Sequence, residues 1–366
     1  MNANPRIALV HDWLTGMRGG EKVLEIFCDL YPEADIFTLI HVPGSVSHRI
    51  ESHPIHTSLF QKLPNIKKYY RYMLPLMPKI MESFNLEGYD LVISTSHCVA
   101  KGCDVPQTTL HICYCFTPMR YIWDQFDTYF NQGQNSFITT FFMKCLRGPL
   151  QKWDITSSER VDTFIGISQF IKNRIKNCYN REATVIYPPA DTSFYTPSPT
   201  ASSDYFLVVS ALVPYKRVDI AIEAFNGSGL PLKIVGTGPL EKKFKAMAKK
   251  NIDFIGWADD TSLRNFYQNC KALIFTSEED FGIVPIEAMA CGKPVIAFKK
   301  GGALETILEN VTGLFFPEQT AQSLLNALNQ WPQYQWEPSR IRHQALNFGK
   351  DIFLKKIKLF LNEKIV

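Results

Sequence analysis

The sequence is 366 residues long, which exceeds one usual domain and suits two domains of moderate size. Charged residues make up 20% of it, and the net charge of +4 is too small to indicate a nucleic-acid-binding protein. Its nine cysteines are an odd set without a Cys-x-x-Cys pair, which indicates reduced thiols rather than disulfides or zinc. No apolar run approaches the roughly 18 residues of a membrane span, so we expect a cytoplasmic protein.

Short apolar runs alternate with longer helical patterns along the chain, which predicts an α/β protein with parallel sheets. The first series of expected strands comprises Arg6–Val10, Asp35–Ile40, Asp90–Ser94, Leu110–Cys115, Thr163–Ile167 and Thr184–Tyr187. The second series comprises Tyr205–Ser210, Leu232–Val235, Ile252–Ile255, Ala272–Phe275, Val295–Ala297 and Gly313–Phe315. We therefore expect two Rossmann-like domains, at 1–190 and 191–345.

One linker and one terminal helix complete this organisation. Thr196–Asp204 is rich in Pro and Ser, so we expect it to connect the domains. Ile341–Leu361 has apolar residues at helical spacing, namely Phe348, Ile352, Phe353, Ile357 and Phe360. We expect this helix to cover apolar surface.

A glycine-containing loop follows the first expected strand. It begins at His11, and Gly19 and Gly20 precede a helix that should start near Glu21. Glycines at this place let backbone amides approach a ligand closely, although a tight loop without a ligand has the same composition. The Gly-x-Gly-x-x-Gly spacing of a dinucleotide-binding loop is absent, which disfavours a nicotinamide-dependent dehydrogenase.

The stretch 52–81 has no acidic residue. Its cations alternate with aromatic side chains, the former being Lys62, Lys67, Lys68, Arg71 and Lys79 and the latter Phe60, Tyr69, Tyr70 and Tyr72. A cation near an anionic leaflet contributes about 1 kcal/mol, and tyrosine suits the boundary between water and acyl chains. The pattern favours either a peripheral contact with the inner face of the cytoplasmic membrane or a solvated helix face with core tyrosines.

The run HICYCFTPMRYIWD, residues 111–124, supplies polar side chains after another expected strand. The candidate contacts for an acceptor are Arg120, Tyr121 and Asp124, together with His11 of the glycine-containing loop. A buried, salt-bridged loop is the alternative interpretation of the same residues.

Two cations follow the first strand of the second series. Lys216 and Arg217 lie at an expected strand-to-helix turn. Arginine offers a planar fork and lysine a mobile point charge, a combination that suits a diphosphate, whereas a solvated basic turn needs no ligand. After the next strand, Gly236 and Gly238 permit close backbone approach before a helix that begins with proline.

The segment Ala272–Pro294 predicts a strand, an acidic loop and a helix opened by Pro285. Such a loop lies at the carboxyl edge of a parallel sheet, where α/β proteins bind ligands. Glu279 and Glu287 offer only acceptors, which suits a ligand rich in hydroxyl groups, although Glu287 also gains about 0.3–1 kcal/mol from the helix dipole alone. The amides that would meet a phosphate or sugar oxygen belong to Phe281, Gly282 and Ile283.

Taken together, these motifs resemble family 4 of the retaining glycosyltransferases. The resemblance implies the GT-B fold, in which two Rossmann-like domains face a central cleft. It also implies that a C-terminal helix, at about 346–366, crosses back to the first, acceptor-side domain. Residues 111–124 are most similar to members that act on bacterial polysaccharide and lipopolysaccharide precursors, many of them mannosyltransferases.

The resemblance implies a role for each matched residue. Glu279 would orient the transferred sugar, and Glu287 would contact the nucleotide ribose. Lys216 and Arg217 would stabilise the leaving diphosphate, while the two glycine loops would face the donor. Trp257 falls where the family holds the base, and a half-buried core aromatic is the alternative there.

Two positions depart from the family pattern. Ala211 stands where many members have an arginine, so Arg217 must supply the second cation or the clamp is weaker. Phe116 stands where most relatives have a histidine beside the donor sugar, and phenylalanine cannot form that hydrogen bond. The donor is then a sugar without the contacted hydroxyl, such as a 6-deoxyhexose, or His11 or His97 replaces the histidine, or the protein is inactive.

The resemblance therefore implies a retaining transfer of mannose or a 6-deoxyhexose from a nucleotide diphosphate sugar, with guanine as the favoured base. The acceptor would be a polysaccharide or a lipid-linked oligosaccharide. No cofactor is implied, and the chain has no Asp-x-Asp for a metal-dependent arrangement. The alternatives are a sugar-nucleotide-binding partner protein that has lost catalysis and a nucleotide-sugar epimerase of the same fold.

Overall fold

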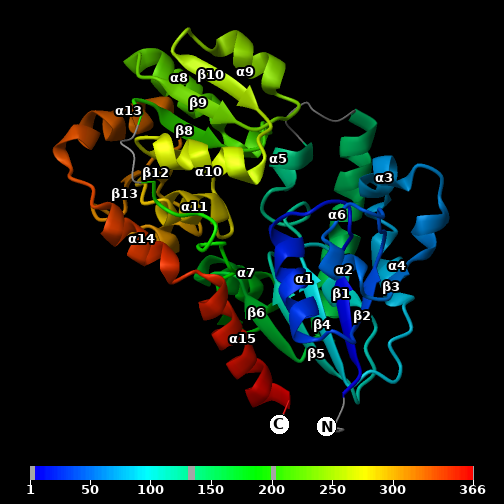
Figure 1. The fold of residues 1–366 in the computed structure, drawn as a ribbon. Coiled ribbons are helices and arrows are strands. Elements are labelled where there is room, and N and C mark those ends of the chain that lie inside the picture. Colours follow the sequence, from blue (N-terminus) through cyan, green and yellow to red (C-terminus); the bar gives the residue numbers. More distant parts are fainter. Residues whose placement is uncertain (1–4, 131–136, 199–202, 366) are drawn as a thin grey trace. The chain divides into compact units, whose positions relative to one another are not determined.

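The computed structural model describes residues 5–130, 137–198 and 203–365 (Figure 1). The chain divides into two compact units, one of Met1–Ile186 with Ile357–Val366 and one of Tyr187–Lys356. Each unit has a parallel sheet with helices, so the expected α/β class is confirmed. Within the described residues, no helix combines the length and the apolar character that crossing a membrane requires.

The first unit contains a seven-stranded sheet in the order β3-β2-β1-β4-β5-β6-β7. Its strands are β1 (Ile7–His11), β2 (Asp35–Thr38), β3 (Ile55–Thr57), β4 (Leu91–Ser96), β5 (Leu110–Cys115), β6 (Thr163–Gly166) and β7 (Ala183–Val185). Its helices are α1 (Gly19–Leu30), α2 (His48–Glu51), α3 (Ile66–Tyr69), α4 (Met77–Glu82), α5 (Phe126–Phe130), α6 (Phe137–Ser158) and α7 (Gln169–Tyr179). Short 3-10 turns lie at Leu59–Lys62, Tyr70–Met73 and Ala100–Gly102.

The second unit contains a six-stranded sheet in the order β10-β9-β8-β11-β12-β13. Its strands are β8 (Phe206–Val209), β9 (Leu232–Val235), β10 (Ile252–Gly256), β11 (Leu273–Phe275), β12 (Val295–Phe298) and β13 (Gly313–Phe316). Its helices are α8 (Val218–Ser228), α9 (Glu241–Met247), α10 (Asp260–Asn269), α11 (Ile283–Ala290), α12 (Ala303–Thr306), α13 (Ala321–Gln330) and α14 (Pro338–Leu346), and 3-10 turns lie at Pro214–Lys216 and Trp331–Gln333. The last helix, α15 (Lys350–Ile365), has residues in both units.

The central strands of the first sheet are buried along their whole length. Every residue of β1 and of β4 is buried, which is the burial expected of parallel strands inside an α/β layer. In both sheets the chain leaves the central strand on one side and later returns on the other. The two switch points therefore lie between β1 and β4 and between β8 and β11, where open α/β sheets form a crevice at the carboxyl ends of the strands.

Three details of the fold differ from the sequence-based expectation. The edge strand β3 was not expected, since three residues are too few to show a pattern. The Thr196–Asp204 linker lies inside the second unit, because the chain is already attached there by Ala190, whose amide donates to the Phe348 carbonyl at 2.8 Å. Residues 199–202 of that segment lie outside the described residues.

The terminal pattern 341–361 is two helices rather than one. The chain breaks after α14 at Asn347–Gly349, where a side chain on Gly349 would approach the Thr192 hydroxyl to 2.9 Å. The ring of Phe348 packs edge-on against the rings of Tyr187 and Phe281. Ile352 was expected to cover apolar surface, but it is 38% exposed.

Candidate functional site

An ion pair spans the switch point of the second sheet. Lys216 lies in the turn after β8, and Glu279 lies in the loop after β11; the Lys216 Nζ contacts the Glu279 Oε1. Both side chains are mostly buried, at 21% and 16% exposure, so solvent screens this pair less than a surface pair. The Thr276 hydroxyl donates to the Lys216 carbonyl at 2.9 Å and holds the turn against β11. The structure thus brings together two predicted site residues 63 positions apart.

Arg217 follows Lys216 in a left-handed conformation, with φ of 52°. Its guanidinium contacts the Asp219 carboxylate, with an Nη2–Oδ2 distance of 3.1 Å. Asp219 is in the first turn of α8, where its negative charge also interacts favourably with the helix dipole. The side chain of Arg217 is therefore held by its own helix, while that of Lys216 reaches Glu279.

The acidic loop is shaped by glycines on two segments. Gly282 has φ of 87°, a left-handed conformation that favours glycine, and it caps α11. The amide of Gly302 donates to the Glu279 carbonyl at 2.8 Å, and a side chain on Gly302 would approach the Phe281 carbonyl oxygen to 2.5 Å. Gly302 was not among the predicted site residues, although a Gly-Gly pair a few residues after the expected strand Val295–Ala297 is the signal that could have found it.

Helix α11 starts at Ile283 and not at Pro285. Pro285 occupies the first turn, where its missing N–H removes no helical hydrogen bond. Phe281 precedes this start as a buried residue that stacks on Tyr187 at 5.6 Å between ring centroids. Of the three amides predicted to meet a ligand, those of Gly282 and Ile283 are at the helix N-terminus.

Glu287 lies within α11 and is only 6% exposed. The hydroxyl of Tyr267, from α10, donates to its Oε2 at 2.9 Å. Burial, and then the Glu287 charge, raise the pKa of Tyr267 well above its usual value, so this hydroxyl keeps its proton. Tyr267 was not predicted as a site residue, but it orients the carboxylate of Glu287, which was predicted.

The glycines after β9 are required by the protein's own backbone. A side chain on Gly236 would collide with the Ser210 carbonyl, and one on Gly238 would come to 2.5 Å from the Leu212 carbonyl oxygen. The loops after β8 and β9 therefore pack backbone against backbone. The following helix starts at Glu241, which corrects the expectation that proline opens it.

Trp257 is 77% exposed, directly after β10. A half-buried core aromatic, one of the two interpretations from sequence, is therefore wrong. An exposed indole at the carboxyl end of a strand is placed to stack on a planar ligand.

The glycine loop of the first unit begins α1. Gly19 and Gly20 are the first two residues of that helix. A side chain on Gly20 would contact the ring of Phe116 at 3.4 Å and that of His11 at 3.5 Å. His11 is buried, and its Nδ1 lies 2.7 Å from the Thr95 hydroxyl on β4. Thus Phe116, His11 and the helix start form one cluster.

Asp12 and His97 lie beside this cluster, and neither was predicted as a primary site residue. Asp12 is fully buried, and its carboxylate accepts the amides of residues 97 to 100 at 2.6–3.0 Å. His97 Nδ1 lies 2.9 Å from Asp12 Oδ2. Burial alone would raise the pKa of Asp12, but the attraction of His97 and these hydrogen bonds lower it to about 2.

The candidate acceptor contacts other than His11 have different surroundings. Asp124 forms an ion pair with Arg174 of α7 at 2.5 Å, and Arg174 also donates to the Thr117 hydroxyl at 2.8 Å. The ion pair of Asp124 favours the alternative interpretation of this residue, as part of a buried, salt-bridged loop. Tyr121 packs against the core of the first unit, and Arg120 is partly buried.

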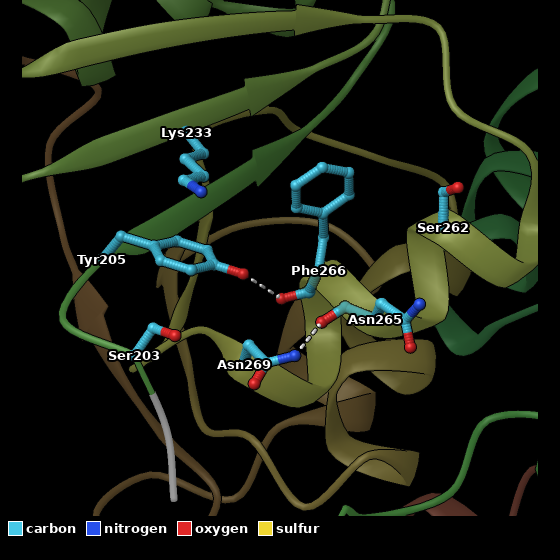
Figure 2. Close-up of a pocket in the computed structure, with 7 residues that line it drawn as sticks. All are labelled: Ser203, Tyr205, Lys233, Ser262, Asn265, Phe266 and Asn269. Carbon is cyan, nitrogen blue, oxygen red and sulfur yellow. Dashed lines mark hydrogen bonds between the residues drawn. The ribbon is translucent and has the colours of Figure 1, made fainter.

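A separate pocket of about 340 Å³ lies near the amino ends of the strands of the second sheet, away from the carboxyl ends that carry the predicted site (Figure 2). The Nζ of Lys233 lies 4.4 Å from the centroid of the Tyr205 ring, near the amino ends of β8 and β9. The pocket is lined by Ser203, Tyr205, Lys233, Ser262, Asn265, Phe266 and Asn269. It contains none of the predicted site residues, which belong to the carboxyl edge.

Among residues 5–130, 137–198 and 203–365, no three His, Cys, Asp or Glu side chains are close enough together to hold a metal ion. All nine cysteines are free thiols.

The comparison with protein families identifies the second unit. Residues 197–347 match the family described as glycosyl transferases group 1, and they carry Lys216, Glu279 and Glu287. The chain contains a group 1 glycosyltransferase domain. The expected resemblance to glycosyltransferases is therefore confirmed.

Curated proteins that are similar to the chain include two from bacteria. The chain is 32% identical over 139 residues to an O-antigen chain mannosyltransferase of Escherichia coli, covering 36% of this chain and 38% of that protein. It is 30% identical over 164 residues to a D-rhamnosyltransferase of Pseudomonas aeruginosa, covering 43% and 41%. The matches span about half or less of the length of the curated relatives.

The fold of the whole chain is shared with solved structures. Anabaena HepE in complex with UDP-glucose aligns with a TM-score of 0.71 at 19% identity, covering 98% of this chain and 99% of that one. At this identity the likeness shows the fold alone. The expected GT-B fold class is confirmed.

Proposed function

We propose that the protein transfers a hexosyl group from a nucleotide diphosphate sugar to a glycan acceptor, with retention at the anomeric carbon. The observation that carries the proposal is the Lys216–Glu279 pair at the switch point of the group 1 domain. The second unit would bind the nucleotide sugar and the first unit, with the C-terminal helix, would provide the acceptor side.

The charges of the pair suit the two halves of the donor. The bond from the anomeric carbon to the diphosphate oxygen breaks, and negative charge grows on the diphosphate, where Lys216 and Arg217 would stabilise it without a metal ion. Glu279 would accept hydrogen bonds from sugar hydroxyls and favour the positive charge that develops on the ring. The acceptor oxygen forms the new bond on the same face, and its proton passes to the departing phosphate.

Mannose or a 6-deoxyhexose is the proposed sugar. The mannosyltransferase and the D-rhamnosyltransferase among the relatives support this class. The Phe116 ring beside Gly20 offers an apolar surface, which suits a methyl group better than a hydroxyl. A guanine diphosphate sugar is the favoured donor.

The acid-free stretch 52–81 supports a peripheral contact with an anionic membrane, where a lipid-linked acceptor would be found. All five of its cations are exposed, as are Leu59, Tyr72 and Leu76, at 64%, 72% and 55%. In co-sedimentation with phosphatidylglycerol vesicles, replacing Lys67, Lys68 and Arg71 by Gln is expected to release the protein. Replacing Lys242, Lys243 and Lys250 of the second unit by Gln should leave binding intact; equal binding by both variants would refute the contact.

The catalytic proposal is tested with two adjacent carboxylates. Glu279→Gln is expected to lower hexosyl transfer at least about 100-fold, because removing one preorganised charge typically costs that much. Glu278 pairs with Lys300 at 3.0 Å instead, so Glu278→Gln should stay within about threefold of the unmodified protein. Nuclear magnetic resonance of the product reports the anomeric configuration. An inverted product, or equal rates in both variants, would contradict the proposal.

A further inference from the structure

One pocket of the second unit lies outside the site of the proposed transfer (Figure 2). Its volume of about 340 Å³ is in the range of pockets that hold small molecules. Helix α10 lines it with residues at i, i+3, i+4 and i+7, which share one face of a helix and extend about 10 Å along its axis. These residues are Ser262, Asn265, Phe266 and Asn269. The lining therefore follows α10 over about two turns.

The start of the sheet contributes to the same pocket. Tyr205 precedes β8 and Lys233 belongs to β9, and Figure 2 shows the Lys233 side chain directed toward the Tyr205 ring. The Lys233 Nζ lies 4.4 Å from the centroid of that ring and 5.8 Å from the centroid of the Phe266 ring. The Tyr205 hydroxyl donates to the Phe266 carbonyl at 3.0 Å and so connects the sheet to the helix. The pocket is thus built into the fold of this unit.

The ammonium group of Lys233 forms no ion pair in the part of the chain that the structure describes. Lys245 of the same unit also lies over an aromatic ring, at 5.9 Å from the Phe254 centroid, but it pairs with the Glu241 carboxylate at 2.7 Å. A ring face attracts a cation and offers no oxygen lone pair, so the hydrogens of the Lys233 ammonium remain for the oxygens of water or a ligand. Lys233 is therefore a positioned donor that the protein itself does not satisfy.

The amides on α10 add both donors and acceptors. Asn269 Nδ2 donates to the Asn265 carbonyl at 2.8 Å, which leaves the side-chain oxygen of Asn269 as an acceptor. The Asn265 amide is exposed and forms no side-chain hydrogen bond within the described residues.

This mixture of groups indicates the class of ligand. A sugar has hydroxyls that donate and accept, and apolar C–H faces that pack on rings such as that of Phe266. A phosphate only accepts, so it would leave the oxygens of the two amides unmatched, and an apolar ligand would leave the Lys233 ammonium unmatched. The lining therefore fits a sugar better than either of these ligands.

We propose that this pocket binds a sugar unit of a glycan chain, with Lys233 and the two α10 amides contacting its oxygens and Phe266 packing on its C–H face. The site is separate from the donor site, because the Lys216–Glu279 pair lies at the carboxyl ends of the strands and this pocket lies near their amino ends. A glycan bound here does not compete with the nucleotide sugar. The bound sugar is either neutral or acidic, since the Lys233 ammonium donates equally to a hydroxyl and to a carboxylate.

The test compares Lys233→Met and Phe266→Leu with Lys245→Met. Methionine keeps an apolar stem beside the rings and removes the ammonium, and Lys245 is a matched control because it also lies over a ring but outside the pocket. Binding of mannohexaose and of a galacturonic acid hexamer is measured by calorimetry at low and high salt. The titrations are repeated with saturating guanine or uridine diphosphate hexose, and thermal unfolding reports whether each variant is folded.

We expect a hexamer to bind the unmodified protein with a Kd of about 1 mM or below, and each pocket variant to weaken it about tenfold through loss of a charged hydrogen bond or of ring contact. Lys245→Met binds normally, and the nucleotide sugar does not displace the hexamer. Preference for the acidic hexamer, weakened by salt, assigns a carboxylate to Lys233, and binding of mannohexaose assigns a hydroxyl.

Three results overturn the inference, namely no binding of either hexamer, displacement by the nucleotide sugar, and an equal loss in Lys245→Met. The proposed function is tested separately by the same titrations. If every nucleotide sugar fails to bind while a hexamer binds at this pocket, the proposed transfer is wrong and the glycan site remains.

Discussion

At the scale of single residues, the two switch points show what sequence patterns can reveal. Lys216 and Glu279 were predicted because each follows an apolar strand within a recognisable motif. Asp12 and His97 are 85 positions apart, and no local pattern connects them. Their pairing depends on β1 and β4 being neighbours, which is a property of the sheet order.

A buried histidine of the first unit gives a prediction about pH. His111 has no exposed surface, and its ring nitrogens lie 2.8 Å from the Ser94 hydroxyl and 3.1 Å from the Arg160 carbonyl. Burial lowers its pKa from 6.5 to about 4. Between these values the unfolded chain binds a proton that the folded one does not, so the free energy of unfolding falls by about 3 kcal/mol as pH drops from 6.5 to 4.

His111→Gln should remove this contribution, since glutamine does not titrate. Urea unfolding of the first unit, followed from pH 7 to 4, is expected to show a shallower loss of stability in the variant. An unchanged pH dependence would mean that His111 does not titrate differently in the folded state.

At the scale of elements, the strands were predicted better than the loops. All twelve expected strands are present within one or two residues at each end, because their apolar runs and flanking turns are local signals. The break at Asn347–Gly349 and the close approach of Gly301–Gly302 to the acidic loop depend on contacts with distant segments. Such contacts leave no periodicity in the sequence, so the shape of the site could not be predicted.

The acidic loop gives a prediction about glycine. Gly302→Ala would push a methyl group into the backbone of Phe281 and displace the loop that carries Glu279. We expect at least a tenfold loss of nucleotide-sugar affinity by calorimetry. Gly227→Ala, in helix α8 with its nearest atom 4.0 Å away, should bind normally and gain about 0.5–1 kcal/mol of stability. Normal affinity in both variants would show that the loop tolerates the displacement.

At the scale of the whole molecule, the two units differ in what is known and proposed of them. The group 1 match lies in the second unit, and the proposed membrane surface belongs to the first. Charge is also uneven. The stretches 52–81 and 137–153 hold eight of the 39 Lys and Arg residues and no acid, which leaves 31 cations against 35 acids elsewhere. The acid-free basic stretches of the first unit are consistent with the membrane contact proposed for that unit.

The most direct test of the central claim is calorimetric titration of the unmodified protein, Lys216→Ala, Glu287→Ala and Lys233→Ala with guanine and uridine diphosphate hexoses. Lys233 belongs to the pocket at the opposite sheet edge, so its variant is the control (Figure 2). We predict that one nucleotide sugar binds selectively, that Lys216→Ala and Glu287→Ala each weaken it about 10- to 100-fold through loss of a charged contact, and that Lys233→Ala does not. Failure of every nucleotide sugar to bind, or binding that survives both site variants, would contradict a donor site at the Lys216–Glu279 pair.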